Sequence, residues 1–591
     1  MTAQLVQRAL TAPTFVAVRR RVFRQLLESL LYEGAVRVRS DGDGDAVVDG
    51  VDDRGEPVRY VFHARRRHTF DRIAVGPAPV RRQAGDGESE ACSVSGFLGE
   101  VRGALEAAPQ QLARFAHELE ETLVKDALAQ YVREQRGDVL ATAGYDTLEA
   151  TITDGHRYHP TYKSRVGFDV ADNLAFGPEF AESVRPLWLA ARRSITELTL
   201  SGAVREEPIL HEQLGTAALA RFAATIQATG EEPADFALVP VHPWQWRERI
   251  ARAFSDHLAA GDLLVLGEDP HAFAAQQSVR TLACADVPQR PYLKLALSIV
   301  NTSTSRVLAP HTVHNAPLVS DWLGGLAAAD PFLRDELRTV LLGEVMGAAV
   351  TPPAAAGADG YGALACIWRE SLHPRLDAGE QAVPFNGLTA RERDGTPLVD
   401  AWVRALGLQT WLARVVEVSA IPLLHLLCRH GVALEAHAQN MVLLHRDGVP
   451  TRVALRDFHD GVRFSRAALA EPERCPDLLP PPAHHQNRNS FLETDDLGLV
   501  ADFLLDAFFF INLGELAIFL ADAYDLDERS FWATAGETIT AYERRFPELA
   551  ERFALFDVRK PAIAVEKLAT RRLLPDTELR LHAVRNPLAC R

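Results

Sequence analysis

Residues Val432 to His459 read VALEAHAQNMVLLHRDGVPTRVALRDFH, and no other stretch says as much about the fold and the chemistry of this chain. Its apolar runs favour buried strands, and the Asp447-Gly448 pair between them is typical of a β-hairpin turn. We therefore predict strands over residues 432–444 and 451–458.

The first of these predicted strands carries a dense polar cluster. Glu435, His437 and Gln439 would share one face of a strand, and Asn440 would turn to that face only at a strand end or bulge. Buried hydrogen-bonding groups are costly without a partner. The oxygens of Glu435 and Asn440, together with Asp457 on the second strand, are donors that Mg²⁺ prefers beside phosphate oxygens. The other interpretation is a polar network at a strand end that satisfies itself.

Helical periodicity and short apolar runs alternate along the rest of the chain. Apolar residues recur at helical spacing over residues 109–135, residues 402–429 predict a long helix bent near Pro422, and residues 497–542 are mostly helical. The apolar runs at 236–239 and 292–297 are typical of buried strands. We therefore predict an α+β fold with mixed helices and sheets.

A lysine inside one of these apolar runs indicates a binding cleft. Lys294 alternates with Leu293 and Leu295, so its charged head would leave the core on the opposite face of the strand. Ser278, Arg280 and Thr281 precede it, and a run of hydroxyl residues that begins at Thr302 leads to Arg306; these side chains can donate to phosphate or carboxylate oxygens. The alternative is a surface lysine on an edge strand.

A second group of donors lies in the glycine- and proline-punctuated loop from Gly155 to Arg165. It holds two histidines, two arginines and a lysine, namely His156, Arg157, His159, Lys163 and Arg165. Such a concentration can bind anionic oxygens. An exposed basic loop is the other interpretation.

Composition excludes several classes of protein. A net charge of −16 argues against a nucleic-acid partner. The six cysteines are scattered without a Cys-x-x-Cys pair, so neither a disulfide framework nor a thiolate zinc site is indicated. The N-terminus lacks the apolar segment of a signal peptide, and no run approaches the ~20 apolar residues of a membrane span. We expect a cytoplasmic protein without a membrane partner.

The common catalytic motifs are missing as well. The sequence contains no Walker P-loop, no Gly-x-Ser-x-Gly nucleophile elbow and no His-Glu-x-x-His zinc motif. Covalent catalysis by serine or cysteine therefore has no support.

In this order, the polar clusters resemble the NRPS-independent siderophore synthetases of the IucA/IucC family, with a C-terminal region like that of FhuF proteins. The resemblance covers residue 151 to the C-terminus and is specific in the combination of its blocks. The matching blocks are His156-x-x-His159-Pro160-x-x-Lys163-x-Arg165, Val241-His242-Pro243-Trp244-Gln245, Ser278-x-Arg280-Thr281, Lys294, Thr302-Ser303-x-x-Arg306, Gly431-x-x-x-Glu435-x-His437-x-Gln439-Asn440, and Arg456-Asp457 with Gly461. One departure is Arg157, where many members carry proline.

The resemblance implies a cupped-hand architecture of three lobes. We expect a thumb-like α/β lobe over residues 1–150, a fingers lobe with the nucleotide-binding motifs over 151–350, and a palm lobe with the metal and carboxylate site over 351–591. It also implies ATP and Mg²⁺ as cofactors and a homodimer.

The same resemblance implies the chemistry of an AMP-forming ligase. A small polycarboxylic acid attacks the α-phosphate of ATP to give an acyl-adenylate and pyrophosphate, and an amine, hydroxylamine or alcohol then displaces AMP. Fixed cations and Mg²⁺ in a water-poor cleft suit the charge that develops on the phosphate oxygens.

Roles follow residue by residue from the matching blocks. The expected nucleotide-binding residues are His156, His159, Lys163, Ser278, Arg280, Thr281 and Lys294. The expected substrate-binding residues are Thr302, Arg306, His437 and Gln439, and the expected metal ligands are Glu435, Asn440 and Asp457. Lys294, Arg306 and His437 are the catalytic candidates, with His437 as the base if one is needed.

Two other functions stay open at this point. His437-x-x-Asn440 followed by Asp457, and the triplet His445-Arg446-Asp447, loosely echo a small-molecule kinase, although Arg452 stands where a kinase needs asparagine. A non-catalytic iron- or siderophore-handling protein related to FhuF is the second alternative, but an iron–sulfur member would need clustered cysteines.

The acid and the nucleophile are not determined by these motifs, because pocket shape selects them. Citrate or a citrate derivative is the favoured acid, followed by a succinyl-hydroxamate and 2-oxoglutarate. The siderophore made and the number of condensations are open as well.

Overall fold

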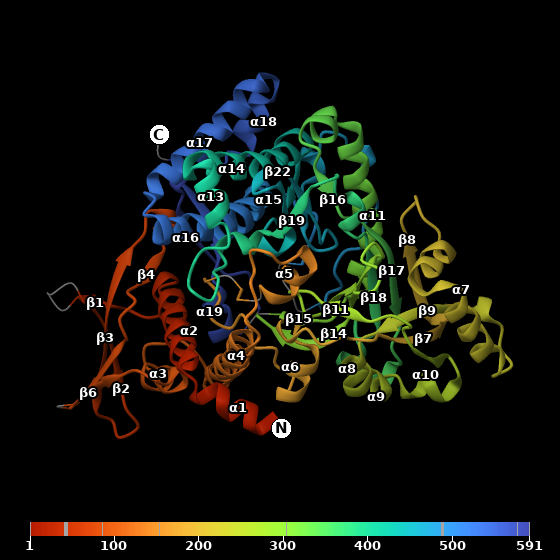
Figure 1. The fold of residues 1–591 in the computed structure, drawn as a ribbon, viewed down its shortest axis with the longest axis horizontal. Helices are drawn as coiled ribbons and strands as arrows, with labels where there is room; N and C mark the ends of the chain where they lie inside the picture. Colours follow the sequence, from red (N-terminus) through yellow and green to blue (C-terminus); the bar gives the residue numbers. More distant parts are fainter. Residues whose placement is uncertain are drawn as a thin grey trace.

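The structure is a computed structural model that describes residues 2–40, 45–85, 87–152, 154–155, 157–302, 304–485, 490–575 and 577–589. Helices and sheets are mixed along the chain, which confirms the predicted α+β class. In Figure 1 the N-terminal sheet lies at one end of the molecule, the middle of the chain lies at the other, and the C-terminal helices lie above them.

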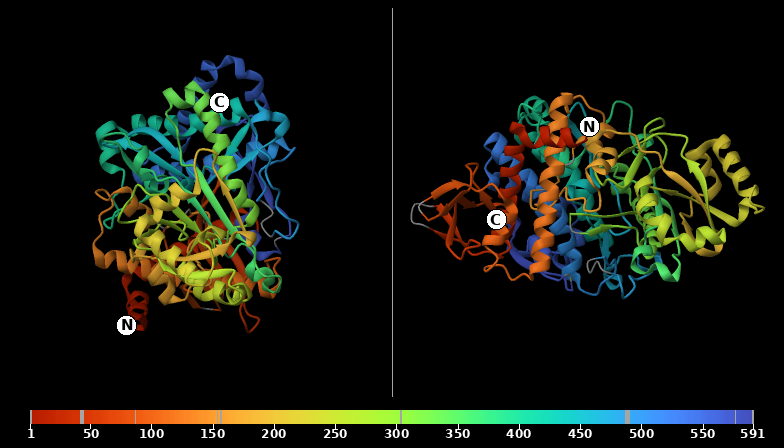
Figure 2. Two further views of the ribbon diagram at one scale, coloured as in Figure 1. Left: turned by 90° about the vertical axis from the view of Figure 1, so that its right-hand side faces the viewer. Right: turned by 90° about the horizontal axis from the view of Figure 1, so that it is seen from below.

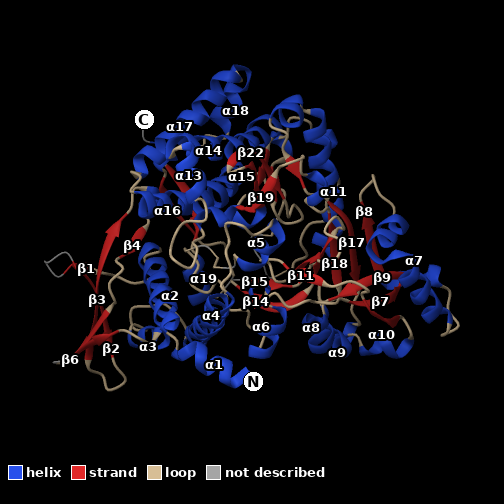
Figure 3. Ribbon diagram, in the orientation of Figure 1, coloured by secondary structure: helices blue, strands red, loops and turns tan. Residues whose placement is uncertain are grey.

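An antiparallel sheet packed against helices forms the N-terminal part. Its strands run in the order β1 (Arg39–Ser40), β2 (Asp45–Val51), β3 (Pro57–Arg66), β5 (Arg81–Ala84) and β6 (Gly87–Glu90), with β4 (Ile73–Val75) also on β3. Figure 3 shows the strands at the outer edge and the helices α2 (Pro13–Tyr32), α3 (Val94–Glu100) and α4 (Pro109–Arg136) on the inner side. The bounds of α4 confirm the helix predicted over 109–135. Pro109 begins the helix, and Gly137, in the left-handed conformation, caps its C-terminal end.

Two sheets form the middle of the chain. The smaller has the order β10 (Leu263–Glu268), β7 (Leu187–Arg192) and β9 (Phe236–Val241), and α7 (Glu206–Gln227) packs beside it. The larger has the order β11 (Phe273–Ala275), β12 (Thr281–Cys284), β13 (Tyr292–Leu295), β18 (Ala365–Arg369), β17 (Glu344–Val350) and β8 (Thr196–Leu200). After β13 the chain forms the hairpin β14 (Leu297–Asn301) and β15 (Thr304–Arg306), and then α11 (Pro310–Ala329), which packs on β17. The strand predicted around Lys294 is thus confirmed.

The C-terminal part places a small sheet among long helices. The sheet has the order β16 (Val340–Leu341), β22 (Val449–Leu455), β21 (Met441–Arg446) and β19 (Gln381–Pro384). The helices are α13 (Asp400–Leu406), α14 (Leu408–His425), α15 (Leu497–Leu504), α16 (Gly514–Tyr524), α17 (Glu528–Arg545) and α18 (Ala550–Leu555). A π-helical segment, Leu505–Leu513, joins α15 to α16, so the mostly helical prediction for 497–542 is confirmed.

Two of these helical segments are long and apolar enough to span a membrane by composition. They are Leu408–His430 and Leu497–Tyr524, and 83% and 94% of their most apolar windows are buried inside the protein. Their apolar surface is therefore already covered by the protein core.

Two expectations about local structure are wrong. The strand predicted over 432–444 divides into β20 (Val432–Leu434), a 3-10 turn at Ala438–Asn440 and β21. The Asn440 side chain donates to the Glu435 carbonyl at 3.0 Å and closes this turn, so Glu435, His437 and Gln439 do not share a strand face. The single helix predicted over 402–429 is divided at Gly407, whose φ of 81° lies outside the helical region, into α13 and α14, and Pro422 lies inside α14.

The end of the chain folds back onto its beginning. The backbone N–H groups of Ala569 and Thr570, in α19 (Leu568–Leu573), donate to Glu33 at 2.9 and 2.7 Å. The strands β24 (Ala562–Glu566) and β25 (Leu581–Arg585) flank this helix in the chain. Seen from below, α4 crosses the middle of the molecule between the N-terminal sheet and the middle of the chain (Figure 2). The parts therefore surround a common interior.

Candidate functional site

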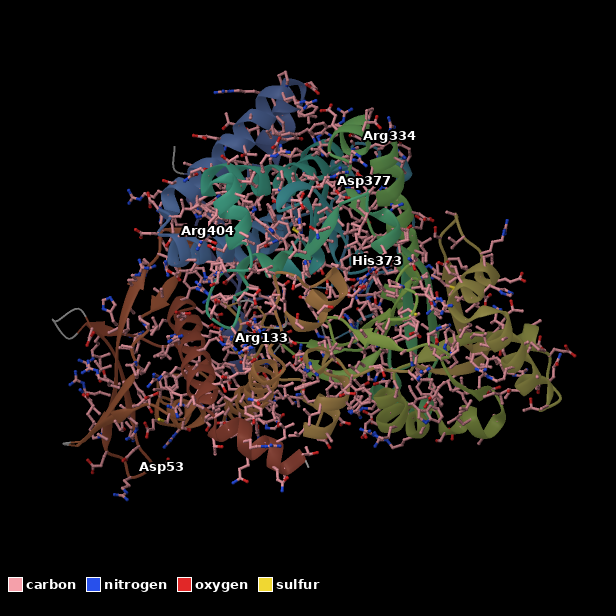
Figure 4. All side chains as sticks on the ribbon, viewed as in Figure 1. Asp53, Arg133, Arg334, His373, Asp377 and Arg404 are labelled. Carbon is pink, nitrogen blue, oxygen red and sulfur yellow. The ribbon has the colours of Figure 1, made fainter. Side chains whose placement is uncertain are left out.

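A cavity of about 2070 Å³ opens where these parts meet. Arg133 of α4, labelled in Figure 4, lines it near the centre of the molecule. Of the residues singled out in the sequence, the cavity is lined by His159, Ser278, Arg280, Lys294, Thr302, Arg306, Glu435, His437, Gln439, Asn440 and Asp457. Stretches that lie almost 300 residues apart in the sequence thus share one space.

The structure does not bring every predicted site residue to this cavity. Lys163 is buried away from the lining, with its ammonium 3.1 Å from Asp126 and 3.5 Å from Glu179. Thr281 is also outside the lining, and its hydroxyl accepts a 2.7 Å hydrogen bond from Ser278. His156 and Ser303 lie outside the described residues. Lys163 therefore stabilises the loop from within, and Thr281 reaches the cavity only through Ser278.

Two arginines form a cationic wall. Arg280 donates to the carbonyls of Arg306 and Val307 at 2.7 and 2.8 Å, which joins the β12 region to the end of β15. Arg306 donates to the Thr302 hydroxyl at 3.0 Å. The Nε atoms of both arginines are buried without a hydrogen-bond partner. Burial, reinforced by the charge of Arg280, lowers the pKa of Arg306 to about 10. An anion in the cavity would offset the desolvation of the two guanidinium charges.

Lys294 lies beside this wall on a central strand. Its strand β13 pairs with β12 on one side and β18 on the other, so the alternative of a surface lysine on an edge strand is wrong. Its ammonium is 3.0 Å from Asp457 Oδ2. Burial, only partly offset by Asp457, lowers the pKa of Lys294 to about 8.

Asp457 is engaged by cations on both carboxylate oxygens. Oδ2 faces Lys294, and Oδ1 accepts a 2.5 Å hydrogen bond from Arg369. Burial opposes the charge of Asp457, but these two cations hold its pKa well below the ordinary range. A metal ion would reach Asp457 only if one of the cations moved away.

Glu435 and Asn440 offer oxygen donors that fit a hard cation better. Glu435 is open to the cavity, with its side chain 38% exposed. Partial desolvation by the cavity walls, followed by the nearby charge of Asp460, raises the pKa of Glu435. A divalent cation beside Glu435 and Asp460 would relieve this repulsion, so the donor set on this side of the cavity fits Mg²⁺.

The polar turn at residues 435–440 is fixed from behind by Arg456. Arg456 donates twice to the Gln439 carbonyl, at 2.8 and 2.6 Å, and pairs with the buried Glu149 at 2.8 Å. Gly461 allows the following turn to close, because a Cβ there would lie only 2.2 Å from the Asp457 carbonyl oxygen. Arg456 therefore holds the polar turn in place from outside the cavity, and Gly461 allows the chain to turn beside it.

Backbone strain occurs in three of the sequence blocks that supply residues to the cavity. Val279, Thr302 and Asp457 have φ values of 69°, 60° and 66°, which residues with a side chain rarely adopt. For β-branched valine and threonine the left-handed region is especially unfavourable. Such strain persists only where the surroundings enforce it, and it is common in functional sites.

Sequence reasoning missed two charged residues beneath the cavity. Glu344 and Arg369 are buried, at 0% and 2% exposure, near the ends of the apolar strands β17 and β18. A single charged residue in an apolar run was the signal that identified Lys294, and the same signal applies to Glu344 in Leu342-Gly343-Glu344-Val345-Met346.

Acidic side chains line the part of the cavity beyond Glu435. They are Asp460, Asp502, Asp506 and Glu566. Two are paired, Asp502 with Lys560 at 2.5 Å and Glu566 with Arg571 at 2.9 Å. Burial, with the charges of Glu566 and Glu435, raises the pKa of Asp506 well above its ordinary value. Arg463 and Arg571 also line this part of the cavity, but the carboxylates outnumber them, so a cation is favoured over an anion here.

The triplet that suggested a kinase is part of a hairpin turn. Asp447 and Gly448 connect β21 to β22 with φ values of 50° and 83°, as in a type I′ turn. The three residues of the triplet do not line the cavity. The hairpin prediction is confirmed, and the triplet gives the kinase interpretation no support.

Comparisons with known proteins agree with this arrangement. Two family models match the chain, "IucA / IucC family" over residues 144–390 and "Ferric iron reductase FhuF-like transporter" over residues 409–581. A citryl-spermidine/3,4-dihydroxybenzoyl-citryl-spermidine:spermidine ligase of Bacillus anthracis is 40% identical over 99% of this chain and 95% of the relative.

Solved structures share the fold over the whole chain. The petrobactin biosynthesis protein AsbB from Bacillus anthracis str. Sterne has a TM-score of 0.93 at 39% identity and covers 100% of this chain and 98% of its own. The ATP-bound aerobactin synthetase IucA from a hypervirulent pathotype of Klebsiella pneumoniae has a TM-score of 0.75 at 19% identity, with 96% and 99% covered. At that identity the second likeness is one of fold.

Proposed function

Because the chain belongs to the IucA/IucC family of siderophore synthetases, we propose that it joins citrate or a citrate derivative to an amine through an acyl-adenylate, with release of AMP and pyrophosphate. The observation that carries this proposal is the cavity itself, in which Lys294, Arg280 and Arg306 face the polar turn at residues 435–440. One wall suits phosphate and carboxylate oxygens, and the other suits a cation.

Each step of the proposed reaction uses groups in this cavity. A substrate carboxylate oxygen attacks the α-phosphorus, and the bond from that phosphorus to pyrophosphate breaks. The amine nitrogen then attacks the acyl carbon, the bond to AMP breaks, and the nitrogen releases a proton. Lys294, Arg280 and Arg306 stabilise the charge that develops on the phosphate oxygens, because they are fixed before the reaction. Holding acid and phosphate together supplies much of the remaining rate gain.

The nucleotide and the acid would take neighbouring places along the cationic wall. We assign Ser278, Arg280 and Lys294 to the triphosphate, with His159 beside them. Thr302, Arg306, His437 and Gln439 would face the acid. Thr281 acts as a positioning residue for Ser278, because their hydroxyls are hydrogen-bonded. If the amine needs a base, His437 is the candidate, since it lines the cavity between Glu435 and Gln439.

Mg²⁺ would be held first by Glu435 and Asn440, with Asp457 as a further ligand only if Lys294 or Arg369 releases it. When bound, the ion would neutralise phosphate charge and orient pyrophosphate as the leaving group.

The acidic end of the cavity supports an amine as the nucleophile. Asp506 and Asp460 would attract a protonated diamine or polyamine, and a second cationic nitrogen would hold the first one near the acyl carbon. The 40% identical relative is named for spermidine, a substrate of this class.

The organisation of the chain is part of the proposal. We assign a thumb-like lobe to residues 1–150, a fingers lobe to 151–350 and a palm lobe to 351–591. Separate apolar clusters in the N-terminal part and the middle of the chain support a division between the first two lobes, although the cluster and the sheet of the middle part extend past residue 350 to β18. We also propose a cytoplasmic homodimer, which light scattering of the purified protein would test.

The experiment that tests this function is carboxylate-dependent adenylation. The purified enzyme with ATP and Mg²⁺ is given citrate, a citrate monoamide, succinate or 2-oxoglutarate, and hydroxylamine traps any acyl-adenylate as a hydroxamate. Citrate or its monoamide should give hydroxamate and equimolar AMP, and Arg306→Ala should abolish both. Formation of ADP in place of AMP, or no nucleotide turnover with any acid, would contradict the proposal.

The two alternatives gain nothing from the fold or the relatives. The His445-Arg446-Asp447 triplet of the kinase alternative lies in the β21–β22 hairpin, outside the cavity. Among the described residues, the groups that could hold a metal contain no cysteine, which gives no support to an iron–sulfur protein. The full-length relative with 40% identity is named as a ligase.

A further inference from the structure

A buried row of polar groups leads from the protein core to the Lys294 ammonium. Glu344 is fully buried and accepts from His459 twice, from the backbone N–H at 2.9 Å and from the ring Nδ1 at 2.6 Å. His459 Nε2 is 3.2 Å from Lys294 Nζ. Glu344 does not line the cavity, whereas His459 and Lys294 do.

The directions of these hydrogen bonds follow from the chemistry of the groups. A lysine ammonium has donors and no acceptor, so His459 Nε2 must accept from it. The ring proton is then on Nδ1, where it donates to Glu344. The carboxylate of Glu344 thus fixes both the tautomer and the orientation of the imidazole.

Glu344, Asp457 and His459 together have the composition of a metal site, since one ligand atom of each lies within 4.8 Å of the others. The Lys294 ammonium lies beside these groups in place of a metal ion, at 3.0 Å from Asp457 and 3.2 Å from His459. A positive charge is therefore built into the site as a side chain.

We propose that Glu344 and His459 are positioning residues that aim the Lys294 ammonium at the nucleotide triphosphate. A lysine side chain has four rotatable bonds and loses rotamer entropy when it is fixed. Asp457 supplies attraction, and His459 supplies a second, directional contact that leaves the remaining donor for phosphate. This inference rests on the proposed nucleotide site, but it concerns binding and not the identity of the acid.

Two substitutions of His459 separate positioning from simple structural support. In His459→Gln the amide oxygen can replace Nε2 as the acceptor for Lys294, while the contact of Nδ1 with Glu344 is lost. In His459→Asn the amide can replace Nδ1 as the donor to Glu344, and the acceptor for Lys294 is lost. Calorimetric titration with a non-hydrolysable ATP analogue and Mg²⁺ measures the outcome without any acid.

We expect His459→Asn to weaken binding of the analogue about tenfold, which is the value of one hydrogen bond to a charged group. His459→Gln should retain affinity within about threefold of wild type. In both variants KM for ATP should change in the direction that the affinity for the analogue requires. If the two variants lose affinity equally, or if His459→Gln loses more, the proposal is overturned. In a Lys294→Met background, His459→Asn should cost nothing further, and an additive loss would also overturn it.

Glu344→Gln keeps the test available if a His459 variant does not fold. This substitution leaves the imidazole in place but removes the carboxylate that fixes its tautomer. In the wild-type background, binding of the analogue should therefore weaken several-fold. In the Lys294→Met background, the same substitution should have little effect on binding. Asp330→Asn is the matched control, because Asp330 is a carboxylate that contacts two buried histidines and none of the three lines the cavity. Equal loss of affinity in the control would contradict a specific role for Glu344.

The outcome is independent of the substrate question. If wild type binds the analogue but adenylates none of the acids, the proposed function fails while the positioning test remains valid. If wild type adenylates citrate and His459→Asn binds the analogue normally, only the positioning role fails.

Discussion

Two groups of carboxylate and histidine side chains lie inside the described part of this protein, and they differ in what occupies their centre. Glu344, Asp457 and His459 lie under the cavity, and Asp330, His425 and His430 lie among the C-terminal helices. Both groups are largely buried, and both bring their ligand atoms within 4.8 Å of one another. Residue type and burial therefore do not separate them.

Hydrogen bonding separates them. Asp330 Oδ2 is 2.9 Å from His425 Nε2 and 3.0 Å from His430 Nε2, and the Tyr542 hydroxyl is 2.9 Å from His425 Nδ1. Asp330 Oδ1 accepts from the backbone of Phe332. This group joins helices to one another, and among the described residues no lysine or arginine pairs with Asp330. The group under the cavity holds Lys294, and its remaining direction is open to the cavity. The proposed nucleotide role of Lys294 rests on these two differences, the central cation and the opening to the cavity.

The largest effect is expected where this central cation is removed. Lys294→Met should lower kcat/KM for ATP by about 10²–10³, because a fixed donor to the reacting phosphates is lost. Citrate-dependent AMP release measures it. Glu380→Gln, a substitution of a buried carboxylate paired with Arg452 away from the cavity, is the control. Comparable losses in both variants would mean that the effect is one of folding.

Asp457→Asn should have the next largest effect. It leaves Lys294 and Arg369 side by side without their shared anion, so turnover should fall about 10²-fold and the free energy of unfolding by about 3 kcal/mol. Half-saturating Mg²⁺ should change less in this variant than in Glu435→Gln, since both oxygens of Asp457 already contact cations. A larger Mg²⁺ shift for Asp457→Asn would identify Asp457 as the principal metal ligand.

Part of the fold and of the candidate site was predictable from the sequence, and part was not. Strands around Lys294, the hairpin turn at Asp447-Gly448 and helix α4 were predictable, because periodicity and turn residues are local signals. The turn at residues 435–440 was not, since the Asn440 side chain competes with the strand for the Glu435 carbonyl. Lys163 could not be told from a ligand, because its partners Asp126 and Glu179 come from other elements. Motif spacing finds charged residues, but only packing shows which of them remain open to a cavity.

The pH dependence of ATP use gives a smaller, graded effect. Burial lowers the pKa of Lys294 to about 8, so its ammonium is present below that pH and lost above it. In free enzyme, kcat/KM for ATP should therefore fall towards tenfold per pH unit above about 8. Lys294→Arg should have lower activity but no such decline up to pH 9, because a guanidinium stays charged. The same decline in both proteins would assign the titration to another group.

Asp330→Asn should have the smallest effect on catalysis and a clear one on stability. Both buried histidines contact the same oxygen, Oδ2, which an amide oxygen can replace, but the amide NH₂ then takes the place of Oδ1 and faces the Phe332 backbone N–H without accepting from it. An unsatisfied buried polar group costs about 2 kcal/mol, so the midpoint of urea unfolding should fall while kcat and KM for ATP stay within about twofold of wild type. The two clusters would then be distinguished by experiment as they are by structure: one alters nucleotide affinity, and the other alters only the stability of the helical core. If Asp330→Asn also raised KM for ATP severalfold, the helical core would be coupled to the cavity, and cavity contact could no longer be used to tell a functional cluster from a structural one.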